Sequence, residues 1–216
     1  MMTIFDLDLS NYKIYIEAGA NDGISQSRSL HLSRKEDWFG VLIEPHPMLY
    51  QASVHQRSNG RTLFVNCGLV SNDYKESHID LYCHSEYSLM NCVSDSIMMK
   101  RNPDNYNNPM SVPAKTLQSI LDDLKIKVVD YFFLDVEGYE KEVINGIGKN
   151  TIIKRLELEQ HNKENFEQEK CEIIQNCKQL NLEYNFTIST SPNESRPNPK
   201  LVFDYQKEQN NGKTKT

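Results

Sequence analysis

Two carboxylates and a pair of glycines are spaced as in a nucleoside-binding site. Glu17 ends an apolar run and is followed by the loop Gly19-Ala-Asn-Asp-Gly23. Glycine lets a backbone approach a ligand closely, and a helix that starts after such a loop presents free N–H groups to an anion. Glu44 closes a second apolar run about 20 residues later, where a carboxylate accepts hydrogen bonds from both ribose hydroxyls. The pattern predicts a cofactor held by Glu17, Gly19, Asn21, Gly23 and Glu44.

The glycine spacing favours S-adenosylmethionine over a dinucleotide as this cofactor. Dinucleotide enzymes fit a pyrophosphate with Gly-x-Gly-x-x-Gly, whereas this loop reads Gly-x-x-x-Gly. An NAD-dependent sugar oxidoreductase is an alternative, but the chain has no Tyr-x-x-x-Lys pair for its proton chemistry. Without a ligand, the loop is simply a tight strand-to-helix turn and Glu44 a solvated strand end before Pro45. Asn66 and Cys67 close a third apolar run and are expected near the adenine, although asparagine there also commonly forms turns.

Acidic and imidazole groups follow two further apolar runs. Asp135 and Glu137 come after one run, and Glu159 and His161 lie at the end of the next. Methyl transfer to a hydroxyl requires in-line approach and removal of a weakly acidic proton, which a positioned carboxylate or imidazole assists. We predict Asp135 and His161 as the catalytic residues, with Asp135 also contacting the cofactor. The alternative is that Asp135 or Glu137 caps the next helix and His161 merely ends a strand.

The same strand ends also allow a metal site. Asp135, Glu159 and His161 offer oxygen and imidazole ligands suited to Mg²⁺ or Mn²⁺. A site that works without a metal ion is the alternative, because three polar strand ends do not define a coordination geometry.

Alternating strands and helices must position these residues. Five apolar runs predict strands at Lys13–Ala18, Gly40–Glu44, Thr62–Asn66, Val128–Leu134 and Ile152–Gln160. Helical segments are predicted between and after them, at Ser25–Lys35, Pro47–Arg57, from Thr116, at Tyr139–Ile147 and around Phe166–Leu180. Two last runs, Glu183–Thr190 and Lys200–Tyr205, suit an antiparallel pair. The alternation predicts an α/β, Rossmann-like fold: a mostly parallel seven-stranded sheet with an antiparallel C-terminal strand pair and helices on both faces.

Length and composition limit the class of protein. The 216 residues suit one domain, expected at 1–206, with 71–111 as an acceptor-side insertion or lid and 207–216 as a disordered tail. A net charge of -6 argues against a nucleic-acid partner, since such binding needs basic residues. Five cysteines without a Cys-x-x-Cys pair, no signal-peptide pattern and no long apolar run predict a soluble, cytoplasmic protein without a membrane span.

Four segments resemble the FkbM family of methyltransferases. They are Ile16–Gly23, Leu42–Pro45, Val112–Leu121 and Phe133–Glu140. The Asp-Val-Glu-Gly segment with its upstream Val-Pro-x-x-Thr-Leu element is fairly specific, whereas the glycine loop is common to many methyltransferases. The resemblance implies a class I methyltransferase fold, S-adenosylmethionine as methyl donor and O-methylation, commonly of sugars or natural products. A sugar or glycan hydroxyl is therefore the expected acceptor.

Acceptor specificity is expected in the region from Tyr82 to Met110, which follows a predicted strand at Ser77–Tyr82 and matches no motif. Tyr87, Arg101 and Tyr106 are candidates to stack on or hydrogen-bond a sugar there, with ordinary loop packing as the alternative. A different class of function also stays open, namely a non-catalytic module that binds a nucleoside or a partner protein on a methyltransferase scaffold. The double Met start and plain tail also allow a domain of a larger glycan-modifying protein.

Overall fold

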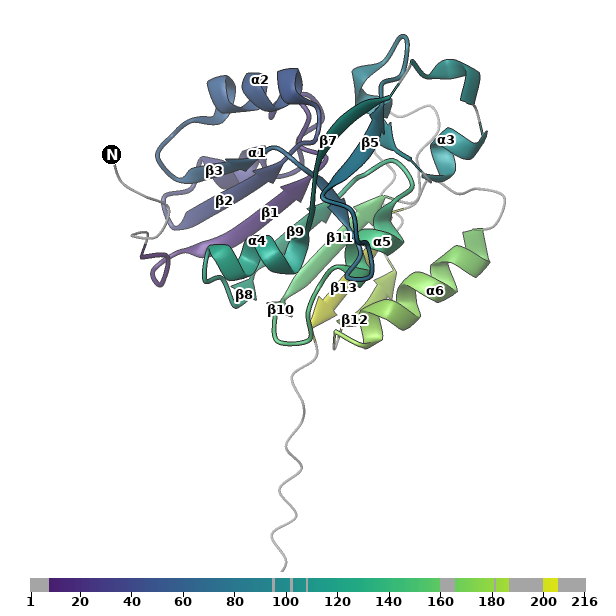
Figure 1. Ribbon diagram of the computed structural model, residues 1–216. Helices are drawn as coiled ribbons and strands as arrows, with labels where there is room; N and C mark the ends of the chain where they lie inside the picture. Colours follow the sequence, from purple (N-terminus) through teal and green to yellow (C-terminus); the bar gives the residue numbers. More distant parts are fainter. Residues whose placement is uncertain are drawn as a thin grey trace, which may run out of the picture.

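A seven-stranded sheet forms the centre of the computed structural model, which describes residues 8–94, 96–101, 103–107, 109–159, 166–180, 182–186 and 200–205 (Figure 1). Its strand order is β12-β13-β11-β9-β1-β2-β3. The strands are β1 Lys13–Ala18, β2 Trp38–Ile43, β3 Thr62–Val65, β9 Tyr131–Leu134, β11 Arg155–Glu159, β12 Leu182–Phe186 and β13 Lys200–Tyr205. The predicted tail at 207–216 lies outside the described residues.

The direction of the strands creates a switch point beside β1. Strands β1, β2 and β3 run parallel in that order, and the chain then returns to the other side of β1 to add β9 and β11, also parallel. Only β13 runs antiparallel to its neighbours β11 and β12. In such sheets ligands bind beyond the carboxyl ends of the strands where the order reverses. The site is therefore expected where β1 and β9 end.

Helices cover both faces of this sheet. They are α1 Leu30–Ser33, α2 Pro47–Arg57, α3 Ile97–Arg101, α4 Leu117–Asp123, α5 Glu140–Asn145 and α6 Phe166–Lys178, with short 3₁₀ turns at Ser88–Met90 and Pro103–Asn105. Ile14 and Ile16 of β1 belong to the main core with residues of α4, α5 and α6. Tyr15 points to the opposite face and packs with Leu32 of α1. No helix among the described residues is long and apolar enough to cross a membrane.

The helix predicted after the glycine loop is mostly absent. Only Leu30–Ser33 is helical, whereas the prediction extended over Ser25–Lys35. Positive φ angles at Asn21 and Gln26, 49° and 56°, interrupt a regular helix, and Asp22 accepts the N–H groups of the two residues at 24 and 25 in a turn. No helix therefore begins directly after the loop to present its N-terminus to a ligand. The prediction of α2 at Pro47–Arg57 is confirmed, with His46 as its N-cap.

A second sheet occupies the region in which the sequence predicted one strand, at Ser77–Tyr82, followed by a long loop or lid. Its four strands, in the order β4-β7-β5-β6, are β4 Gly68–Val70, β7 Met110–Thr116, β5 His78–Tyr82 and β6 Cys92–Val93. Ile79 and Leu81 of β5 are buried between exposed neighbours, the alternation of a strand with one face on a core. In Figure 1, β5, β7 and α3 lie together beyond one end of the central sheet. The predicted lid is thus a folded layer.

Two of the predicted strands are interrupted. Val128–Val129 forms β8 and pairs with β10, Ile152–Ile153, in a small parallel sheet separate from β9 and β11. The predicted Val128–Leu134 and Ile152–Gln160 strands therefore each divide into two pieces, since Asp130 and Lys154 separate them.

Candidate active site

A cavity of about 400 Å³ lies where the carboxyl ends of β1, β2 and β9 meet the second sheet. This volume lies in the usual range for small-molecule sites. Five predicted site residues line it, namely Glu17, Gly19, Asn21, Glu44 and Asp135. The topology brings together groups that are up to 118 positions apart in the sequence, Glu17 and Asp135 among them.

Three other predicted cofactor contacts are not among the described residues that line the cavity. Asn66 donates hydrogen bonds of 2.8 Å from its Nδ2 to the backbone carbonyls of Glu44 and Pro45, which is the turn-forming role. Cys67 is buried in the main core, where burial raises the pKa of its thiol to about 12. Gly23 packs against α2, and its carbonyl accepts a hydrogen bond from Arg57.

Glu44 is a buried carboxylate held by backbone groups. Its Oε2 accepts from the N–H of Asn21 at 2.8 Å, and its Oε1 accepts from the N–H of His46 at 2.9 Å. Burial raises the pKa of Glu44 to about 7, and these two hydrogen bonds oppose the shift. Each carboxylate oxygen can accept more than one hydrogen bond, so Glu44 keeps acceptor capacity for donors in the cavity.

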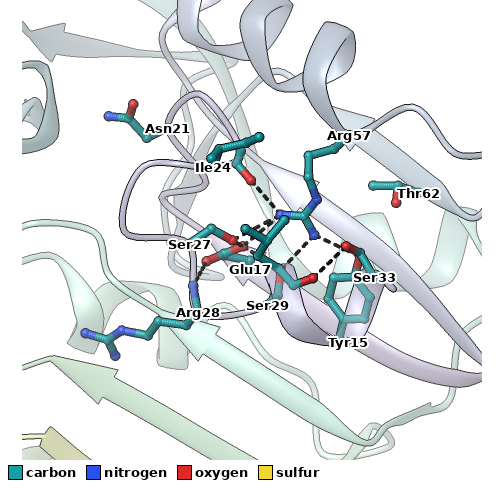
Figure 2. A network of polar contacts seen from close by, with 12 residues as sticks. Tyr15, Glu17, Asn21, Ile24, Ser27, Arg28, Ser29, Ser33, Arg57 and Thr62 are labelled. Carbon is teal, nitrogen blue, oxygen red and sulfur yellow. Dashed lines mark hydrogen bonds and ion pairs between the residues drawn. The ribbon is translucent and has the colours of Figure 1, made fainter. Parts of the chain in front are cut away.

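Glu17 organises the loop between β1 and α1. Its carboxylate accepts from Ser27 Oγ at 2.8 Å, Ser29 Oγ at 2.6 Å and the backbone N–H of Arg28 at 2.7 Å. The guanidinium of Arg57 lies 3.9 Å from it and is itself buried (Figure 2). The carboxylate is thus largely engaged by the protein, which favours a structural role for Glu17 beside the cavity.

Gly19 lets two strand ends approach closely. Its φ is +78°, and a Cβ there would clash with the backbone carbonyl of Asp135. The N–H of Asp135 in turn donates to the carbonyl of Ala18 at 3.1 Å. Glycine is therefore needed here for contact between β1 and β9 as well as for access by a ligand.

Asp135 is presented by a tight turn at the end of β9. The turn uses positive φ at Glu137 and Gly138, 53° and 89°. The buried Glu140 accepts from the N–H groups of Val136 and Gly138, each at 3.2 Å, and so holds the turn. Arg28 Nη2 lies 3.5 Å from Asp135 Oδ2 at the cavity wall.

The second sheet supplies the opposite wall. Tyr87, Leu89, Met90, Asn91, Cys92 and Met98 line the cavity from this side. Tyr87 is 58% exposed, as expected for a side chain at a cavity mouth. Tyr106 is not among the described residues lining the cavity, and it packs edge-on against His84 with ring centroids 5.3 Å apart. The side chain of Arg101, the third predicted acceptor contact, lies outside the described part of the structure.

The metal alternative and the second predicted proton acceptor involve side chains outside the described part of the chain. His161 lies outside the described residues, and the side chain of Glu159 is not described either. Within the described part of the chain, no group of three His, Cys, Asp or Glu side chains could hold a metal ion. Of the two predicted catalytic groups, Asp135 lies within the described residues, and it lines the cavity.

Sequence reasoning missed Arg28, Arg57 and Glu140. Nothing in the local pattern marks an arginine at the end of an amphipathic helix as buried, because its burial depends on β1 and the loop it contacts. The Asp-Val-Glu-Gly-Tyr-Glu segment did carry a signal for Glu140, since a carboxylate in the first turn of a helix can accept the free N–H groups there.

The strand order, the switch point and the cavity define the fold of the class I S-adenosylmethionine-dependent methyltransferases. The model of the methyltransferase FkbM domain matches residues 17–188. The chain therefore belongs to the FkbM methyltransferase family, as the sequence segments predicted.

Solved structures share the fold at low sequence identity. The crystal structure of methyltransferase FkbM from Methylobacillus flagellatus KT is 15% identical with a TM-score of 0.52, over 89% of this chain and 44% of that one. The N-terminal domain of human METTL16 in complex with SAH is 12% identical with a TM-score of 0.52, over 94% of this chain and 65% of that one. This chain thus spans less than two thirds of either. A search of curated protein sequences finds no match.

Proposed function

We propose that this protein transfers a methyl group from S-adenosylmethionine to a hydroxyl of a sugar or glycan. The observation that carries the proposal is the buried carboxylate of Glu44 at the wall of a 400 Å³ cavity, fixed by two backbone N–H groups. A rigid acceptor at the end of the second strand suits the ribose diol of a nucleoside. The family match supplies methyl transfer as the reaction class.

The residues present fit the proposed cofactor. Glu44 would hold the ribose hydroxyls, and Gly19 with Asn21 would border the same end of the ligand. Apolar lining from Leu69, Leu81 and Phe133 suits the flat adenine ring, and the carboxylates suit a cation. The cofactor supplies a methyl group on a positively charged sulfur, which an oxygen nucleophile attacks in line.

We propose Asp135 as the group that removes the acceptor proton. It lies at the carboxyl end of β9, on the cavity wall, and its carboxylate is about one-third exposed. A carboxylate within hydrogen-bond reach of the acceptor hydroxyl would orient it and take its proton as the oxygen attacks. The turn held by Glu140 fixes the position of this carboxylate. His161 stays a second candidate.

The second sheet would bind the acceptor. Tyr87 presents an exposed ring at the cavity mouth, and Asn91 adds an amide to the wall. Sugar rings stack on aromatic faces and hydrogen-bond amides, so these groups support a sugar acceptor. The net charge of -6 favours a neutral or cationic acceptor over a nucleic acid.

Calorimetric titration with S-adenosylmethionine and, in parallel, NAD tests the cofactor. Wild-type protein should bind S-adenosylmethionine but not NAD. Glu44→Ala should weaken S-adenosylmethionine binding at least about tenfold, because the variant loses a hydrogen bond to a charged group. A screen of glycans with radiolabelled methyl donor then tests the acceptor. Binding without transfer to any hydroxyl would instead support the non-catalytic module.

A further inference from the structure

The glycine loop has no backbone donors to spare for an anion. The N–H groups of residues 19–25, 27 and 28 all donate to acceptors within the protein. The short α1 begins only at Leu30, so no helix N-terminus follows the loop directly. Of the two features that ordinarily hold an anion at this edge of such a sheet, most of the loop N–H groups are therefore engaged, with Gln26 the exception, and a helix N-terminus does not follow the loop directly.

Arg28 supplies the positive charge in their place. Among the described residues that line the cavity it is the only cationic one, whereas four carboxylates line the same cavity, those of Glu17, Glu44, Asp135 and Glu137. Its backbone N–H is fixed on Glu17 at 2.7 Å, and its side chain is 14% exposed. Figure 2 shows that side chain directed away from the network of Glu17 and Arg57. The guanidinium thus reaches the cavity from a rigid anchor.

We propose that Arg28 binds the carboxylate of the amino-acid end of the methyl donor, an assignment that rests on the proposed function. A guanidinium binds a carboxylate with two parallel hydrogen bonds, a strong and directional pairing. Its separation from Asp135 is 3.5 Å, a loose ion pair. The incoming carboxylate exchanges with Asp135 at Arg28, which frees Asp135 to face the acceptor hydroxyl.

The test compares two ligands that differ by one carboxylate, S-adenosylmethionine and decarboxylated S-adenosylmethionine, by calorimetry. Wild-type protein should bind the complete molecule 10–100-fold more tightly, as expected for a hydrogen-bonded charge pair worth about 1.5–3 kcal/mol. Arg28→Gln should remove this preference and leave the affinity for the decarboxylated ligand within about threefold. Arg28→Lys should keep part of the preference, because it keeps the charge but loses the fork. Arg34→Gln, at an exposed arginine just after α1, is the matched control and should change neither affinity.

The outcomes separate the assignment from the proposed function. An Arg28→Gln protein that keeps the preference for the carboxylate, or that loses affinity for both ligands equally, would overturn the role of Arg28 while the cofactor itself stands. A wild-type protein that binds neither ligand would overturn the proposed function, and the assignment with it.

Discussion

The guanidinium of Arg57, in the last turn of α2, donates a 2.6 Å hydrogen bond to the carbonyl of Gly23 in the glycine loop. Its other donors reach Ser27 Oγ at 3.0 Å, Ser29 Oγ at 3.2 Å and Tyr15 OH at 3.1 Å. One side chain therefore ties β1, the loop and α2 together behind the cavity. The loop owes its shape to this contact, because it has no long helix to continue into.

Replacing Arg57 should destabilise the fold and not only the site. Arg57→Met leaves the buried Glu17 carboxylate without its cation and four polar groups without this donor. Breaking a buried pair in this way costs about 3–5 kcal/mol. Urea unfolding should show this loss, with Arg34→Met as the exposed control expected within about 0.5 kcal/mol of wild type. A loss no larger than that of the control would show that Arg57 does not hold the loop.

Gly19 and Gly60 form a matched pair for a second test. Both have positive φ, +78° and +76°, but a Cβ at Gly19 would clash with the carbonyl of Asp135 and one at Gly60 meets nothing within 4 Å. Gly60→Ala should cost about 1 kcal/mol for the backbone conformation alone. Gly19→Ala should cost clearly more and also weaken S-adenosylmethionine binding, because β1 and β9 must separate. Equal losses of stability in the two variants would contradict the close approach.

Cofactor affinity should depend on pH through Glu44. Burial raises the pKa of Glu44 from its ordinary value of 4.5 to about 7, so the carboxyl is largely neutral below pH 7 in the ligand-free protein. Only the ionised form accepts from both ribose hydroxyls, and affinity should therefore rise between pH 6 and pH 8. Glu44→Gln should flatten the profile. His46, whose pKa burial lowers, stays in both proteins, so a profile that persists in Glu44→Gln would point to that residue or another group.

The same shift predicts how stability varies with pH. Between pH 4.5 and pH 7 folded Glu44 holds a proton that the unfolded chain has released. The contribution of Glu44 to stability is therefore greatest below about pH 4.5 and falls as pH rises through 7. Thermal unfolding of the ligand-free wild type and of Glu44→Gln should converge at low pH, with the variant gaining relative stability towards pH 8. A constant difference between them would contradict the raised pKa.

The sequence predicted those parts of the fold in which burial is continuous along the chain. The runs at β1 and β2 are each buried over five consecutive residues, and Glu44 could be placed because it follows one of them. Of the second sheet only β5 was predicted, at Ser77–Tyr82, and the other strands were missed because they are short or interrupted, with β6 containing only Cys92–Val93. Their pairing is decided by contacts with β7 and the core, which local patterns do not encode.

The site shows the same division. Residues at strand ends were found from the topology, since all parallel strands end at one edge. Residues whose role depends on a distant partner were not, and Arg57 differs from an ordinary surface arginine only by the groups around it. Cys67 was predicted near the adenine because it closes an apolar run, and its side chain lies in the main core.

Asp135→Asn tests the step that the site is proposed to perform. Asparagine keeps the size of the side chain but cannot take a proton, so the rate of methyl transfer should fall about 10²–10⁴-fold. Affinity for S-adenosylmethionine should stay equal or rise, because Arg28 loses the carboxylate that competes for it. Single-turnover transfer and calorimetry on the same preparation would measure both. Glu140→Gln is the companion variant, because it weakens the hydrogen bonds that hold the turn carrying Asp135. It should lower the rate of methyl transfer with little effect on the affinity for S-adenosylmethionine. An unchanged rate of methyl transfer in Asp135→Asn would show that another group accepts the proton, and His161 would be the first residue to examine.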